Sequence, residues 1–250
     1  MPVPASTDDD ATFAAREQIL RSSDLRVLGR MRWSSNVTLL CELVDPTNTS
    51  DPEVVRGRAI YKPHAGEQPL WDFPDGLYRR EVGAYHLAQA LGWDLIPPTV
   101  ERDGPHGVGS VQWFVEADFD RHYFEQREDP ALHPQLRRMA AFDMVANSTD
   151  RKGGHVLIDA DDHLWGIDNG LCLHAEFKLR TVIWDFAGEP LDEGLVEDLD
   201  TFAQAPLIDD LATLLDPFER EALQTRARAL VTSGRLPVDP TGRRYPWPLV

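Results

Sequence analysis

Acidic and histidine side chains gather in one short stretch of the chain, TDRKGGHVLIDADDHLWGIDNG, which spans residues 149–170. Asp150 opens the stretch, His155 follows it by five residues, and Asp168 lies near its end. A carboxylate in a polar loop can accept a proton from a reacting group, and carboxylate and imidazole groups can hold a divalent cation. These three residues therefore make the stretch the first candidate for a reactive site.

Helical and strand patterns indicate which elements position the three residues. Apolar residues recur with a helical period through residues 129–149, and short strands are expected at 155–160 and 164–168, on either side of the turn DDH. Asp150 is then expected in the loop after a long helix, and Asp168 at the end of the second strand. Both carboxylates should face one cleft between two lobes.

The first half of the chain has the pattern of an antiparallel sheet with one inserted helix. Helices are expected at 11–22 and 77–92, and strands at 24–31, 36–44, 58–63, 97–103 and 110–117. From residue 117 onward helical patterns dominate, including one over 216–234. The sequence therefore predicts an α+β protein with two lobes, residues 1–116 and residues 117–250.

A lysine and a glutamate in the predicted first lobe add a second constellation. Lys62 lies on the third expected strand, and Glu81 lies on the following helix, nineteen residues later. In protein kinases a strand lysine orients nucleotide phosphates, and a helix glutamate holds its flexible side chain. Kinases also place a base aspartate five residues before a metal-binding side chain, as Asp150 stands to His155, and a second metal-binding aspartate after a short hairpin, as at Asp168.

Four segments, YKP, RREVGAYHLAQALG, NSTDRKGGH and IDNG, resemble the small phosphatidylinositol 3-/4-kinase-related proteins of actinobacteria over roughly residues 25 to 190. The resemblance implies the two-lobed kinase-like fold, with Asp150 and Arg151 as catalytic residues and Asp168 as a metal ligand. Three features depart from the family pattern. His155 replaces the usual metal-binding Asn, RWSSN replaces a glycine-rich phosphate loop, and the accessory domains of lipid kinases are missing.

The expected ligands are ATP and a divalent cation, Mg²⁺ or Mn²⁺, with His155 and Asp168 as metal ligands. Hydroxyls and backbone amides of a hairpin turn could cradle phosphate oxygens, and the backbone at the end of the first lobe should bind adenine. The candidate nucleotide-binding residues are Lys62 and Glu81, the turn residues Ser34, Ser35 and Asn36, and Phe114, Val115 and Glu116.

Composition excludes several classes of partner and predicts a cytoplasmic protein. The net charge of −17 would repel nucleic acid and anionic membranes, so neither a nucleic-acid partner nor a stable membrane association is expected. The N-terminal sequence does not have the pattern of a signal peptide, and no apolar run approaches the length of a membrane span. Two cysteines, Cys41 and Cys172, offer no disulfide framework.

Several functions remain open at the level of sequence. The first is a kinase acting on a protein or small-molecule hydroxyl. The alternatives are a nucleotide-binding pseudokinase that regulates other proteins, a lipid kinase, and a nucleotidyl transferase. Individual residues have simpler interpretations too: Asp150 could be a turn former, His155 a structural anchor, and the turn 34–36 only a turn. A zinc site built from His155, His163, His174 and Asp168 is disfavoured, because their spacing is not that of helical metal ligands.

Overall fold

The computed structural model describes residues 7–31, 36–47 and 54–250, and these divide into two compact units. The sheet unit contains the described residues up to Tyr85 together with Pro97–Phe114. The helical unit contains His86–Ile96 and Val115–Val250. Within the described residues, no helix is both long enough and apolar enough to cross a membrane.

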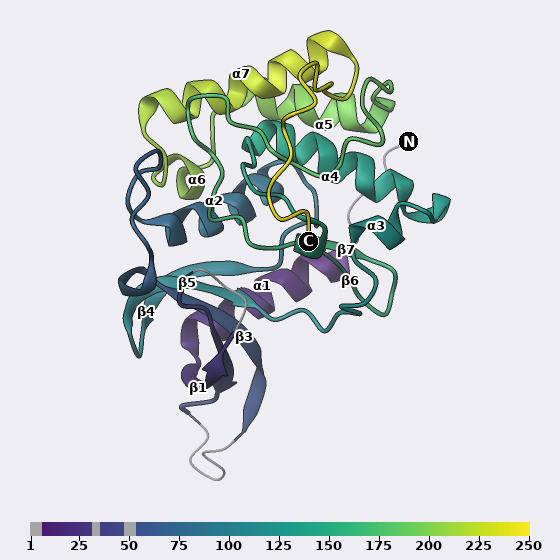
Figure 1. Ribbon diagram of the computed structural model, residues 1–250. Helices are drawn as coiled ribbons and strands as arrows, with labels where there is room; N and C mark the ends of the chain where they lie inside the picture. Colours follow the sequence, from purple (N-terminus) through teal and green to yellow (C-terminus); the bar gives the residue numbers. More distant parts are fainter. Residues whose placement is uncertain (1–6, 32–35, 48–53) are drawn as a thin grey trace. The chain divides into compact units, whose positions relative to one another are not determined.

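The sheet unit is built on five antiparallel strands, as the alternating patterns predicted (Figure 1). Their order across the sheet is β1-β2-β3-β5-β4. The strands are β1 (Asp24–Arg30), β2 (Leu39–Val44), β3 (Val55–Pro63), β4 (Thr99–Gly104) and β5 (Gly107–Trp113). The helix α1 (Thr7–Ser22) precedes them, and α2 (Leu77–Ala90) is inserted between β3 and β4. The predicted helices at 11–22 and 77–92 are therefore both present.

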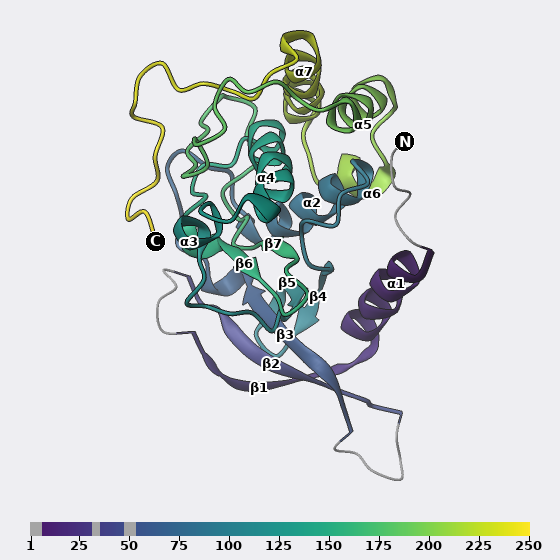
Figure 2. The ribbon, with the colours of Figure 1, turned by 90° about the vertical axis from the view of Figure 1, so that its right-hand side faces the viewer.

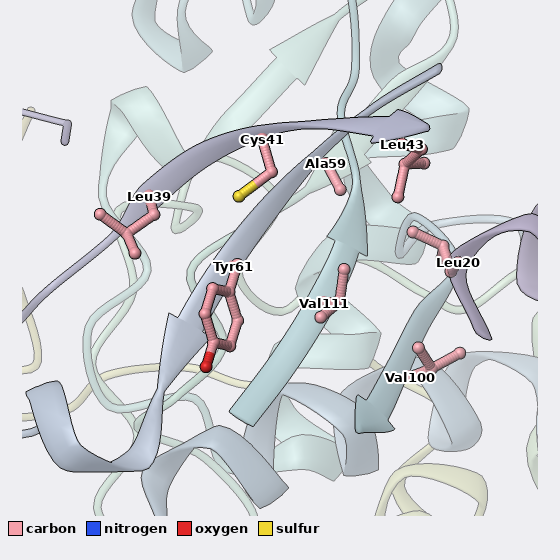
Figure 3. Packing of buried hydrophobic residues seen from close by; sticks show 8 residues of the cluster. All are labelled: Leu20, Leu39, Cys41, Leu43, Ala59, Tyr61, Val100 and Val111. Atoms are coloured by element: carbon pink, nitrogen blue, oxygen red, sulfur yellow. The ribbon is translucent and has the colours of Figure 1, made fainter. Parts of the chain in front are cut away.

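One face of the sheet is covered by a compact apolar core (Figure 3). Strand β2 alternates buried and partly exposed side chains, so Leu39, Cys41 and Leu43 all point to this core. Tyr61 of β3 is also buried, and its hydroxyl donates a hydrogen bond to the carbonyl of Gly107, 2.5 Å away. The complete cluster is Leu20, Leu39, Cys41, Leu43, Ala59, Tyr61, Val100 and Val111.

Strand β5 ends earlier than the sequence predicted. The apolar run continues to Ala117, but the last paired residue of β5 is Trp113, opposite Ala59. Phe114 donates its amide to the carbonyl of Arg58, and the chain then leaves the sheet. The run beyond Trp113 is apolar because it is partly covered after leaving the sheet, which an alternating pattern cannot distinguish from strand pairing.

The helical unit contains α4 (His133–Ala146), α5 (Glu193–Gln204) and α7 (Pro217–Ser233), with α7 packed on both others (Figure 1). The shorter helices are α3 (Tyr123–Gln126) and α6 (Asp209–Ala212). The ends of α7 follow the predicted signals: Asp216 forms a capping box with Glu219, and Gly234 closes the helix at a φ of 60°.

A two-stranded hairpin, β6 (Val156–Ile158) and β7 (Leu164–Gly166), also belongs to the helical unit. Its turn is organised by Asp159, whose carboxylate accepts hydrogen bonds from the amides of Asp161 and His163 and from the indole of Trp165. The predicted pair of short strands around DDH is therefore present. Because the hairpin directly follows the loop that contains Asp150, it brings the second acidic motif back to the first.

Candidate active site

The loop that carries Asp150 begins where α4 ends. Asn147 closes the helix in the left-handed conformation, with a φ of 57°, a region that asparagine tolerates better than most residues. Its side chain accepts a hydrogen bond from the amide of Lys178 at 2.8 Å and donates to the carbonyl of Glu176 at 2.7 Å. One residue thus ends the helix and also holds the segment that follows the second acidic motif.

Asp150 is a partly buried carboxylate next to a cation. Its side chain is 28% exposed, and its Oδ2 lies 3.1 Å from Nζ of Lys152. Burial raises the pKa of Asp150 above its ordinary value; Lys152 opposes this shift, and the charge of Asp168 adds to it. A carboxylate with a raised pKa is a stronger base, which suits a group that accepts a proton at neutral pH.

His155 and Asp168 lie side by side, as expected for two ligands of one cation. Nδ1 of His155 lies 2.9 Å from the carbonyl oxygen of Asp150, which can only accept, so Nδ1 carries a proton. The longer contact from the amide of Lys152, at 3.5 Å, is too weak to reverse this assignment. In the neutral ring Nε2 then presents a lone pair, and it lies 3.3 Å from Oδ2 of Asp168. Two acceptors at this distance require a proton or a cation between them.

Asp168 has an unusual backbone conformation for a residue other than glycine. Its φ is 57°, in the left-handed region, and its side chain is half exposed. Such a conformation costs of order 1 kcal/mol for most residues but is more accessible to aspartate and asparagine. The next residue, Asn169, is buried and anchors the turn by donating to the carbonyl of Gly166 at 3.3 Å. Neighbouring contacts therefore hold a backbone conformation that presents the Asp168 carboxylate outward.

Arg151 connects the loop that contains Asp150 with the loop that contains Asp168. Its guanidinium is buried and donates to both carboxylate oxygens of Asp143, at 3.0 and 3.3 Å. It also donates to the carbonyl of Ile167 at 2.8 Å and to Oδ1 of Asn169 at 2.7 Å. Thr181 completes the cluster, because its hydroxyl donates to Asp143 at 3.0 Å. The sequence predicted Arg151 as a catalytic residue, whereas its side chain in the structure lies among groups that position the loops.

Removing the guanidinium of Arg151 should strongly destabilise the fold. In Arg151→Ala the carboxylate of Asp143 would be left buried without its cation, and such a loss costs about 3–5 kcal/mol. The free energy of unfolding in urea should fall by that amount. The control is Arg228→Ala, which removes an exposed ion pair to Glu221 and should change stability by less than about 1 kcal/mol. Equal stability of the two variants would contradict the assignment of Arg151 as the anchor of both loops.

In the sheet unit, Lys62 and Glu81 form the ion pair that the sequence predicted. Lys62 projects from β3, and Glu81 lies on α2; their side chains are 19% and 4% exposed. The start of α2 is held by Glu67, whose carboxylate accepts hydrogen bonds from the amides of Leu77 and Tyr78 at 2.9 and 2.6 Å. A negative side chain at a helix N-terminus is favourable because it pairs with the free amides there. The helix that carries Glu81 is thereby fixed to the segment that follows Lys62.

The other predicted nucleotide-binding residues differ in whether the structure describes them and in what they contact. Ser34 and Ser35 lie outside the described residues. Asn36 is described, and its side-chain oxygen accepts a hydrogen bond from the amide of Gln68 at 2.9 Å, so it links two loops of the sheet unit. Phe114 donates its amide to the carbonyl of Arg58 at 3.0 Å, so this amide is used inside the protein.

The four residues considered for a zinc site do not come together in the part of the chain that the structure describes. His163 is bonded to the carbonyl of Asp94, at 2.6 Å, and Nδ1 of His174 accepts from the amide of Glu176, at 3.0 Å. Another trio, His64, Glu67 and Asp75, has ligand atoms within 4.8 Å of one another. The pairing of His64 with Asp75 and the capping of α2 by Glu67 account for that arrangement.

Asp143, Asn169 and Thr181 are not among the site residues predicted from the sequence. Asp143 had a detectable signal, because it lies on the same helical face as the buried Met139 and Ala146. A charged residue on a buried face needs a charged partner. Nothing in the sequence around Thr181 indicates that it contacts α4, because the contact joins residues 38 apart.

Comparison with known proteins gives the class of fold. The hydra Fam20 structure with sugar aligns with a TM-score of 0.50 over 93% of this chain and 91% of that chain, at 11% identity. The Helicobacter pylori proinflammatory kinase CtkA aligns with a TM-score of 0.51 over 86% of this chain and 93% of that chain, also at 11% identity. The chain has a two-lobed kinase-like α+β fold, as the sequence predicted.

A protein of related sequence shows the family to which this chain belongs. The chain is 38% identical to Protein Rv2133c of Mycobacterium tuberculosis over 268 aligned positions, which cover 92% of this chain and 94% of that protein. The chain belongs to the same family as Rv2133c. No family model matches the chain. The narrower resemblance to phosphatidylinositol 3-/4-kinase-related proteins therefore stays a prediction.

Proposed function

We propose that this chain is an ATP-dependent phosphotransferase that phosphorylates a hydroxyl group of a protein or a small molecule with the help of a divalent cation. The observation that carries the proposal is the arrangement of the three residues in the helical unit. Nε2 of His155 lies beside the carboxylate of Asp168, and Nδ1 of His155 is bonded to the backbone of Asp150. A candidate base and a candidate metal pair therefore lie in one connected loop system.

The residues present fit a divalent cation. Asp168 supplies an exposed carboxylate oxygen, and the Nδ1 hydrogen bond of His155 fixes the tautomer in which Nε2 can act as a ligand. A bound Mg²⁺ or Mn²⁺ would neutralise the phosphate charge of ATP. An imidazole ligand suits Mn²⁺ better than Mg²⁺, because Mg²⁺ strongly prefers oxygen.

Asp150 is proposed to orient the acceptor hydroxyl and to take its proton. Burial raises the pKa of Asp150, which makes its carboxylate a stronger base than an ordinary aspartate. Arg151 is proposed to act as a positioning residue, since its guanidinium binds the loop after β7 and not the outward face of the site. Lys62, held by Glu81, is proposed to pair with phosphate oxygens.

The remaining parts of the proposal rest on fold class and charge. Residues 1–116 would serve the phosphate and adenine side, with the backbone of Phe114, Val115 and Glu116 contacting the base, and residues 117–250 would carry the catalytic loop and metal motif. We place the chain in the phosphatidylinositol 3-/4-kinase-like superfamily and in the cytoplasm as part of the proposal. The net charge of −17 argues against a nucleic-acid substrate and against a lipid substrate in an anionic membrane surface, because both surfaces carry negative charge.

A nucleotide-binding regulatory protein is the second candidate. The observation that favours it is His155 itself, which occupies the position where an oxygen ligand would be expected for Mg²⁺. Such a protein would bind ATP with a metal and would transfer nothing.

Removing the positive charge of Lys62 should weaken nucleotide binding. A hydrogen bond to a charged group contributes about 1.5–3 kcal/mol, so Lys62→Met should lower ATP affinity roughly ten- to hundredfold in calorimetric titration. Glu81→Gln should act in the same direction with a smaller effect. Because Lys62→Met leaves the Glu81 carboxylate buried, the double variant Lys62→Met with Glu81→Gln separates lost binding from lost folding. Lys178→Met, which removes a partly exposed lysine of the helical unit, is the matched control.

Wild-type affinity in a folded Lys62→Met variant would contradict the role given to this lysine.

The proposal as a whole is tested by ATP titration with and without a chelator. With Mn²⁺ or Mg²⁺ present, binding is expected, and EDTA should weaken it at least about tenfold, because an acidic protein cannot hold a free tetra-anion well. The same dissociation constant with and without EDTA would contradict the metal-assisted proposal.

A further inference from the structure

The last residues of the chain form a strap across the helical unit. We define the C-terminal strap as residues 239–250. In Figure 2 it runs from the region of α7 to the side of α3 and has no regular secondary structure (Figure 2). The carbonyl of Arg244 accepts hydrogen bonds from the amide of Thr181 and from the indole of Trp184, both at 3.1 Å. The carbonyl of Leu249 accepts from the amide of Gly153 at 2.7 Å.

These contacts fall on the two segments that carry the proposed chemistry. Gly153 lies three residues after Asp150 in the catalytic loop, and Thr181 is bonded to the Asp143 carboxylate that anchors Arg151. A short parallel bridge joins Arg151 to Thr181. The strap therefore bridges the loop that holds the proposed base and the segment after the metal motif.

The two glycines of the catalytic loop lie next to the strap. A Cβ atom on Gly153 would lie 3.4 Å from the Leu249 carbonyl oxygen and 3.1 Å from the ring of Phe124. A Cβ atom on Gly154 would lie 3.8 Å from a methyl group of Val250. The distances to Leu249 and Val250 are those of ordinary van der Waals contact, so these two residues lie directly against the catalytic loop.

The strap is held by a few local contacts and is otherwise open to solvent. Asp239 folds its start into a turn, accepting hydrogen bonds from both the amide and the hydroxyl of Thr241 and from the amide of Arg244. The guanidinium of Arg244 lies 4.6 Å from the ring centroid of Phe177, and Pro246 is buried. Trp247, by contrast, is 86% exposed. A segment bound mainly through main-chain carbonyls and one buried proline can be displaced by another extended chain.

We propose that the C-terminal strap is an autoinhibitory segment that competes with a polypeptide acceptor for the catalytic loop. The inference rests on the proposed function, and it specifies an acceptor class. The donors that the strap uses, the amides of Gly153 and Thr181 and the indole of Trp184, are those that an extended peptide would use through its own carbonyls. The strap must leave Gly153 before an acceptor chain can lie there.

The test uses full-length variants that release the strap away from the catalytic loop. Asp239→Ala removes the carboxylate that forms the turn, and Pro246→Asp places a charge at a buried position, which favours the released state. Val238→Ala changes the neighbouring, 65% exposed side chain and is the matched control. Hydrogen exchange at the Gly153 and Thr181 amides reports release directly, and transfer from γ-labelled ATP to a mixed peptide pool reports activity.

In variants whose strap is released, the Gly153 amide should exchange its hydrogen at least tenfold faster than in the wild type and in Val238→Ala. The same variants should transfer at least several-fold more label than these two proteins. A synthetic peptide with the sequence of residues 239–250 should reverse the gain. Faster exchange with equal or lower transfer would overturn autoinhibition and would make the strap a support for the loop. Unchanged exchange in both variants would also overturn it. Absence of metal-dependent ATP binding in the wild type would instead refute the proposed function.

Discussion

Replacing Asp168 with asparagine should remove both ATP binding and phosphoryl transfer. Its carboxylate is the proposed anionic ligand of the metal, and an amide there would leave the nucleotide charge uncompensated in a protein with a net charge of −17. Loss of a group that only supports a ligand already costs 10–100-fold in metal affinity, so loss of the ligand itself should weaken Mn²⁺-dependent ATP binding by at least about 100-fold. Titration calorimetry and label transfer measure the two effects.

Asparagine is well tolerated in the left-handed conformation that Asp168 adopts, so Asp168→Asn should fold normally. Asp161→Asn is the matched control, because Asp161 is an exposed aspartate in the turn of the same hairpin. A folded Asp168→Asn variant that binds ATP and metal as the wild type does would show that the metal site is elsewhere.

Replacing Asp150 with asparagine should separate chemistry from binding. Its carboxylate is proposed to accept the proton of the acceptor and is not proposed to hold the metal, so metal-dependent ATP binding should persist. Loss of a general base lowers transfer by about 10²–10⁴-fold. The measurement is the rate of label transfer at saturating ATP, with the ATP dissociation constant determined on the same sample.

The contact that ties Asp150 to His155 uses the backbone carbonyl of Asp150, so Asp150→Asn leaves it in place. Loss of the side-chain contact to Lys152 is tested by Lys152→Met, which removes the cation and keeps the carboxylate. If Asp150→Asn also lost ATP binding while Lys152→Met kept it, the carboxylate would belong to the metal site and not to the base.

The elements of this fold could be predicted from the sequence because their signals are local. Strand alternation gave all five strands of the larger sheet, and capping residues such as Asp216 and Gly234 gave the ends of α7. The ion pair of Lys62 and Glu81 was also predictable, because a strand and the helix that directly follows it place both residues in one unit.

The buried groups that hold the loops of Asp150 and Asp168 could not be predicted in the same way. Arg151 carries no local sign of pointing inward, and its direction depends on Asp143 of α4 and Asn169 beyond the hairpin. The contact of Leu249 with Gly153 joins residues almost one hundred positions apart, and no periodic pattern records such a pairing. Local patterns locate the residues that could react, whereas long-range packing decides which of them only hold the others.

The most direct measurement of the central claim follows the two ends of the ATP phosphate chain. The wild-type protein is incubated with Mn²⁺ and a cell extract, in parallel with γ-labelled and α-labelled ATP. A phosphotransferase should move only the γ label to an acceptor, and Asp150→Asn should suppress this transfer by about 10²–10⁴-fold. Transfer of the α label, or metal-dependent ATP binding with no transfer of either label, would contradict the account.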